Sequence, residues 1–109
     1  MNIQRFAKER AQAAHNGTIL ASAFVPEGMR VPFGSAWGYM EPGKAMESHR
    51  HPTQEIYVVI SGRGVVTVDQ EQADVGPGDV IDIPPDADHT IAAAGPDPLL
   101  WAALWWEVQ

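Results

Sequence analysis

The sequence predicts an all-β domain, built either as a closed barrel or as a sandwich. Nine prolines and ten glycines punctuate a chain of 109 residues, which favours short strands and many turns over a helical bundle. Apolar runs recur at roughly 8–12-residue intervals, a spacing typical of barrels and sandwiches rather than of alternating β and α units. The length and the 45% share of hydrophobic residues predict one domain with a small core.

Two segments are expected along the chain. Residues 1–16 carry the only helical spacing of apolar residues, so we expect a short helical or irregular segment there. Residues 17–109 form the barrel domain, in which proline and glycine clusters end each strand because both residues favour turns. The expected strands are Thr18–Phe24, Ser35–Met40, Glu55–Ile60, Val65–Val68, Gln72–Val75, Val80–Ile83, His89–Ala94 and Leu99–Trp106.

Charge and composition exclude several classes of partner. The net charge of -7 disfavours nucleic acid and anionic membranes, because phosphate binding needs a basic patch. The chain has no cysteine, which excludes disulfides and thiolate ligands and suits a reducing compartment. No charged-then-apolar leader is visible, and the apolar run Leu99–Trp106 is too short to cross a bilayer. We therefore expect a soluble, cytoplasmic protein.

The stretch "HRHPTQE" concentrates three metal-ligand side chains within seven residues. Side chains alternate along an extended chain, so His49 and His51 project from one face, with Cα atoms roughly 6–7 Å apart. That separation lets two imidazoles converge on one ion. Glu55 opens the next strand and can return to the same interior. A fourth ligand would come from elsewhere in the chain, where the remaining histidines are His15 and His89.

Two motifs resemble those of the cupin family. "GKAMESHRHPTQEIYVVISG" at 43–62 matches the complete first cupin motif, and "GDVIDIPPDADHTIAA" at 78–93 resembles the second. The second motif departs twice, because Asp86 stands where the family has Gly and Ala93 where it has Asn. Neither position supplies a ligand, and Asp tolerates a left-handed turn better than most residues.

The resemblance implies a double-stranded β-helix, the jelly-roll barrel of cupins, around one divalent transition metal. The implied ligands are His49, His51, Glu55 and His89. Family members hold Fe, Mn, Ni, Cu, Zn or Co with such a set, and ligand type alone does not decide among these metals. His15 is then expected to be a surface residue.

Aromatic residues near the ligands are candidates for the pocket. Tyr57 shares the parity of Glu55 and should face the interior, where its hydroxyl could act on a substrate or could simply belong to the core. Trp37 and Tyr39 share one face of the preceding strand and are expected either to line the pocket or to fill the barrel. A one-residue slip of register would turn these side chains outward.

A mononuclear metal enzyme acting on a small organic molecule is the function we expect. Four protein ligands leave up to two positions open on an octahedral ion, as a site for substrate or O₂ requires. A dioxygenase-type oxidoreductase is favoured, with an isomerase or a lyase next. The alternative is a non-catalytic small-molecule-binding or sensor cupin. Sensors usually carry a second, DNA-binding or signalling domain, for which this chain is too short.

The last apolar run, "LLWAALWW", predicts a homodimer. One face of the strand can point inward, whereas the other face, with its tryptophans, needs cover. A second copy is the expected cover, and the N-terminal segment is the alternative.

Overall fold

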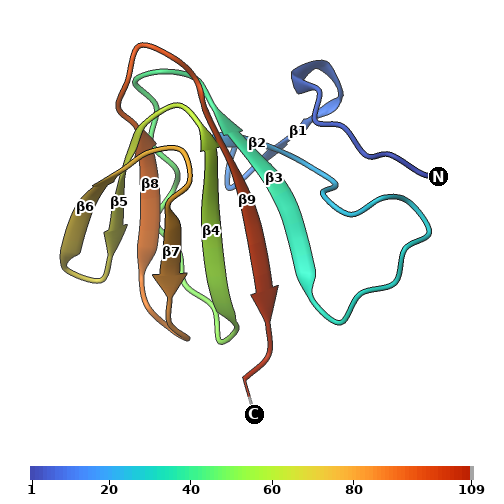
Figure 1. Ribbon diagram of the computed structural model, residues 1–109. Coiled ribbons are helices and arrows are strands. Elements are labelled where there is room, and N and C mark those ends of the chain that lie inside the picture. The colour runs from blue at the N-terminus through green and yellow to red at the C-terminus, as the bar shows by residue number, and fades with distance from the viewer. Residues whose placement is uncertain (109) are drawn as a thin grey trace.

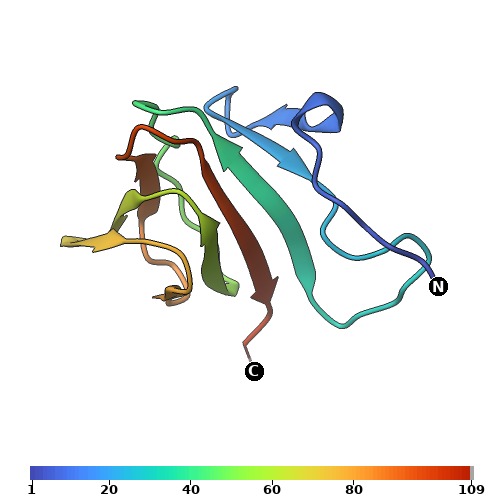
Figure 2. The ribbon, with the colours of Figure 1, turned by 45° about the horizontal axis from the view of Figure 1, so that its top comes forward.

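The computed structural model describes residues 1–108, which form two antiparallel sheets that face each other (Figures 1 and 2). A six-stranded sheet has the order β1-β2-β3-β9-β4-β7, and a three-stranded sheet has the order β6-β5-β8. The strands are β1 (Gln12–Ala14), β2 (Ile19–Ser22), β3 (Gly34–Met40), β4 (Gln54–Ser61), β5 (Gly64–Val68), β6 (Glu71–Val75), β7 (Val80–Ile83), β8 (His89–Ala93) and β9 (Leu99–Trp106).

The predicted all-β jelly-roll class is confirmed. Each of the eight expected runs overlaps one of the strands β2 to β9. Alternation places the core between the sheets: on β4, Glu55, Tyr57 and Val59 are buried while their neighbours are more exposed. Among residues 1–108 the two sheets do not join into one continuous hydrogen-bonded ring, so the barrel is open at its edges.

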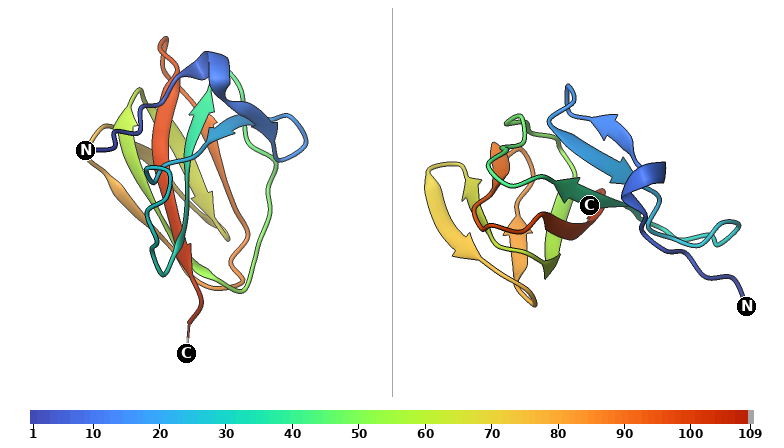
Figure 3. Two further views of the ribbon diagram at one scale, coloured as in Figure 1. Left: turned by 90° about the vertical axis from the view of Figure 1, so that its right-hand side faces the viewer. Right: turned by 90° about the horizontal axis from the view of Figure 1, so that it is seen from above.

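Residues 1–16 are largely irregular rather than helical, the second of the two forms expected for this segment. This segment holds one 3-10 turn, Lys8–Arg10, and then strand β1, which pairs with β2. A helix shorter than about 12–15 residues is marginal without packing, and no residue of the turn is buried. Phe6 instead stacks on Tyr39 of β3, with ring centroids 5.5 Å apart. The N-terminal segment, dark blue, runs along the β2–β3 side of the molecule (Figure 3). Residues 1–108 contain no helix that could span a lipid bilayer.

Cross-strand pairs of glycine and tryptophan join β3 to β9. Gly38 lies opposite Trp101 and Gly34 lies opposite Trp105, and each indole covers the space that a glycine side chain would occupy. A Cβ atom on Gly38 would lie 2.3 Å from Cε2 of Trp101. Two of the three tryptophans of β9 therefore point into the barrel, and only Trp106 lies on the outer face that we expected the tryptophans to occupy.

We predict that Gly38→Ala destabilises the fold by about 1–3 kcal/mol, because the added methyl group overlaps the fully buried indole of Trp101. The measurement is the midpoint of chemical denaturation. Ser35→Ala, on the same strand but without a comparable clash, should shift the free energy of unfolding by less than about 0.5 kcal/mol. Equal midpoints for Gly38→Ala and the parent would contradict the packing described.

Candidate metal centre

A backbone bridge brings the two sequence motifs together. The N–H of His49 donates to the carbonyl of His89 at 3.2 Å, and the N–H of His89 donates to the carbonyl of His49 at 2.9 Å. The turn before β8 is tied to the first motif as well, because the N–H of Asp86 donates to the carbonyl of His51 at 2.8 Å. Asp86 adopts a φ of 62°, the left-handed conformation expected where the family has Gly.

The four predicted ligands lie together. One nitrogen or oxygen atom from each of His49, His51, Glu55 and His89 falls within 4.8 Å of the others. Oε1 of Glu55 lies 3.0 Å from Nε2 of His51 and 3.2 Å from Nε2 of His89. Adjacent ligand atoms on an ion with bonds of 2.0–2.2 Å are separated by about 3 Å, so these two spacings already match coordination. The cluster can hold a divalent metal ion.

Hydrogen bonds orient the three imidazoles. Each ring uses Nδ1 toward a backbone carbonyl two residues away: His49 toward Glu47 at 3.0 Å, His51 toward Thr53 at 3.1 Å, and His89 toward Ala87 at 2.9 Å. An Nδ1–H that donates to a carbonyl fixes the tautomer in which Nε2 carries the lone pair. All three rings therefore suit a metal on the Nε2 side.

The surroundings of Nε2 of His89 show that a metal ion fits the site. His89 is 1% exposed, and its Nε2 has no hydrogen bond of acceptable geometry although it lies near Glu55. A buried polar atom without a partner is costly, and a metal ion would satisfy it. The donor set of three imidazoles and one carboxylate suits divalent transition metals.

Burial and the Glu55 carboxylate shift the imidazole pKa values in opposite directions. Burial lowers the pKa of His49 below its usual value, although the carbonyl of Glu47 raises it in part. Burial also acts to lower the pKa of His89, but the Glu55 carboxylate 3.2 Å away and the carbonyl of Ala87 together outweigh it, so that pKa is raised. His89 is therefore the more basic of these two imidazoles.

A cavity of about 230 Å³ opens beside the cluster. Glu55, His49 and Tyr57 contribute its polar atoms, and Trp101 and Trp105 form part of its apolar wall. Tyr57 is 3% exposed, and its hydroxyl meets only Sδ of Met46, at 3.9 Å, among the hydrogen-bond contacts of residues 1–108. This hydroxyl remains available to a molecule inside the cavity.

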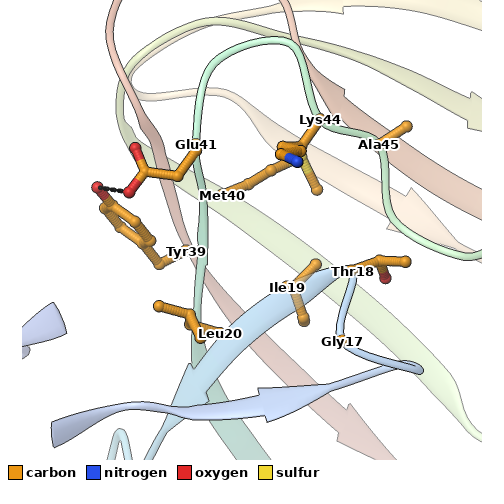
Figure 4. Close-up of a pocket in the computed structure, with 9 residues that line it drawn as sticks. All are labelled: Gly17, Thr18, Ile19, Leu20, Tyr39, Met40, Glu41, Lys44 and Ala45. Atoms are coloured by element: carbon orange, nitrogen blue, oxygen red, sulfur yellow. Dashed lines mark hydrogen bonds between the residues drawn. The ribbon is translucent and has the colours of Figure 1, made fainter. Parts of the chain in front are cut away.

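The structure places the rings of Trp37 and Tyr39 on the same face of β3, where both pack against Phe6. Trp37 contributes to the cavity wall, while its ring packs against Phe6 and Phe24. Tyr39 does not line this cavity; it borders a separate open groove, where its hydroxyl donates to Glu41 at 3.3 Å (Figure 4). On β3 the buried positions are Gly38 and Met40, so the parity assigned to Tyr39 belongs to the opposite face.

His15 was expected at the surface, and it is exposed, but it also reaches the cluster. Its ring stacks on that of His49, with centroids 4.1 Å apart and planes inclined by 26°. His15 lines the same cavity as Tyr57. Sequence patterns carry no signal for this approach, because it depends on how the β1–β2 hairpin folds over the barrel.

Comparison with known sequences now decides the family. A family model described as the Cupin domain matches residues 36–107. The chain belongs to the cupin family. The match includes both motifs and all four cluster residues.

Known cupins extend the comparison. A cupin 2 conserved barrel domain protein from Salinispora arenicola superposes with a TM-score of 0.86 over 99% of this chain and 90% of its own, at 24% identity, which establishes the shared fold. Oxalate decarboxylase from Bacillus subtilis, a protein with Mn(II) centres, has a TM-score of 0.66 and 28% identity over 72% of this chain and 22% of its own.

A sequence relative has a named activity. Dimethylsulfoniopropionate lyase DddW from Ruegeria pomeroyi is 38% identical over 61 residues, which are 56% of this chain and 40% of the lyase. The matches to the curated relatives cover only 42% and 40% of those proteins' lengths.

We predict that purified protein carries about one divalent ion per chain. His49→Ala or His89→Ala should lose most of it, because each removes one of the four ligand atoms. Elemental analysis after purification without chelator or nickel resin measures the content. Glu71→Gln, an exposed acid on β6, is the control that should keep the ion. Full occupancy in both histidine variants would refute the site.

Proposed function

We propose that this cupin is a mononuclear metal-dependent enzyme acting on a small organic molecule in the cavity beside the cluster. The observation that carries this proposal is that ligand atoms of three imidazoles and one carboxylate lie within 4.8 Å of one another beside an open cavity. Four protein ligands leave up to two positions of an octahedral ion for the ligand molecule. A bound ion would supply Lewis acidity or redox capacity to an oxygen atom of that molecule.

Tyr57 is the proposed acid or hydrogen-bond donor. Burial, followed by the charge of Glu55, raises the pKa of Tyr57 well above its usual value. The phenol therefore keeps its proton across the physiological range. Because its Oη has only a weak sulfur contact, it can donate to an oxygen of the substrate or hold the proton that the reaction moves.

The reaction class draws support from the relatives. One is named a lyase, and one is named an oxalate decarboxylase, so both act on molecules that carry a carboxylate. These names support cleavage of a bond in a small carboxylate, within the lyase class that the sequence placed after dioxygenases. Oxygenation and isomerisation remain predictions from the sequence.

The test is turnover of small carboxylates by protein loaded separately with Mn, Fe, Co, Ni, Cu or Zn. Tyr57→Phe should retain the metal and lower turnover about a hundredfold or more, because a positioned acid contributes at least that factor. Ser35→Ala serves as the control. Carboxylates that bind, raise the melting temperature and are recovered unchanged would instead assign a non-catalytic binding module.

We also propose a homodimer through the outer face of the six-stranded sheet. Strand register places apolar side chains side by side on this face, where Ile56 lies opposite Leu104 and Val58 opposite Val80. Val80 is 61% exposed and nearby Ile60 is 44% exposed. The N-terminal segment packs on β3 through Phe6, which supports a second copy as the cover for β4 and β7.

Light scattering at micromolar protein concentration should give twice the mass of 11.8 kDa for the parent chain. Val80→Glu should yield the monomer, because each copy would bury a charge in the interface. Gln72→Glu, which adds the same charge on β6 away from this face, should remain dimeric. A monomeric parent would contradict the proposal.

A further inference from the structure

His15 occupies the boundary between the cavity and solvent. It is exposed, yet it lines the cavity and covers one face of the His49 ring at 4.1 Å. A residue that is both exposed and part of the wall lies at the mouth. Among residues 1–108, the His15 carbonyl accepts hydrogen bonds but neither ring nitrogen of His15 takes part in one. The ring nitrogens can therefore bond a molecule in the cavity.

The turn that carries His15 has an unusual backbone. His15, Asn16 and Gly17 have φ values of 50°, 57° and 77°, which places three consecutive residues in the left-handed region. For a residue with a Cβ atom that conformation is unfavourable, and it persists where the surroundings impose it. Thr18 closes the turn, with its N–H and hydroxyl donating to the His15 carbonyl at 3.2 and 2.7 Å.

Glu47 ties this turn to the metal cluster. Its carboxylate accepts a hydrogen bond from the Asn16 amide, and its N–H donates to Oγ1 of Thr18 at 3.0 Å. Its carbonyl accepts from Nδ1 of His49 at 3.0 Å. One residue therefore fixes both the tautomer of a ligand and the turn that lays His15 over that ligand.

His15 does not belong to the ligand set. The four atoms that converge within 4.8 Å come from His49, His51, Glu55 and His89. The His15 ring meets the cluster by its face, whereas a metal bond needs a nitrogen in the ring plane. At the mouth of the cavity, His15 therefore presents its imidazole N–H as a hydrogen-bond donor.

The cavity favours a ligand with an anionic head and an apolar body. A divalent ion with Glu55 leaves a net charge of about +1 at one end, and a carboxylate would neutralise it. Trp101, Trp105 and Ala103 line the wall without charge. At 230 Å³ the space holds a ligand the size of about eight water molecules.

We propose that His15 is a substrate-contacting residue that donates a hydrogen bond to the carboxylate of a small organic acid held at the metal. The inference rests on the proposed function and adds the residue that recognises the carboxylate. The stack on His49 holds the donor, and the Glu47 contacts prevent the turn from swinging away.

Propionate is the probe, and the visible absorption of the Co(II)-loaded protein is the readout. Propionamide, which has nearly the same shape but no charge, is the matched control ligand. We expect propionate to perturb the spectrum and propionamide not to do so. His15→Phe keeps a ring to stack on His49 but has no N–H, and it should bind propionate about tenfold more weakly, the loss expected for one hydrogen bond to a charged group.

His15→Gln restores a donor and should bind within about threefold of the parent. Cobalt content should be the same in both variants and in Gln12→Ala, an exposed control on β1. Equal propionate affinity in His15→Phe and the parent would overturn the inference, as would cobalt loss in both His15 variants, which would make His15 a support for His49. A parent that binds cobalt but not propionate would overturn the carboxylate assignment alone. A parent that binds no metal would remove the proposed function itself.

Discussion

The antiparallel bridge between His49 and His89 is the constraint on which the site depends. Its two backbone hydrogen bonds, of 3.2 and 2.9 Å, set the register between segments that are far apart in sequence. Side chains alternate along both segments, so a slip of one residue would turn His89 out of the barrel. The same register lets β8 continue along β5, where His89 lies opposite Val68. The register that pairs these segments therefore also determines the position of the His89 side chain.

The buried carboxylate of Glu55 explains why this site calls for a cation. Glu55 is 4% exposed, and its ion-pair contacts among residues 1–108 are with His51 and His89, not with lysine or arginine. A buried carboxylate is expensive unless a positive charge accompanies it. The three imidazoles beside Glu55 are neutral donors in the Nδ1–H tautomer, so a divalent ion bound to their Nε2 atoms would supply that charge. The carboxylate of Glu55 therefore affects both the stability of the fold and the affinity of the site for a cation.

Strand prediction succeeded where the signals are local. Proline and glycine clusters mark the ends of the strands, and the alternation on β4 places Tyr57 beside Glu55 on the buried face. Alternation misled on β3, because Gly38 has no side chain and Met40 alone marks the inward face, whereas the large rings of Trp37 and Tyr39 share the other face. Trp101, from the opposite strand, fills the space above that glycine. The hydrophobic pattern along one strand does not reveal an inward face that is covered by a ring from the neighbouring strand.

The sequence by itself determined strands β2 to β9 and grouped His49, His51 and Glu55, because these depend on spacing within a few residues of chain; His89 followed from the resemblance of its motif to the second cupin motif. Only the tertiary structure decided that residues 12–14 form a strand, that Tyr39 faces away from the cavity and that His15 covers His49. Those outcomes depend on hydrogen bonds and ring contacts between distant segments. No local preference encodes them, since the partner that stabilises each arrangement is elsewhere in the chain until folding brings it near.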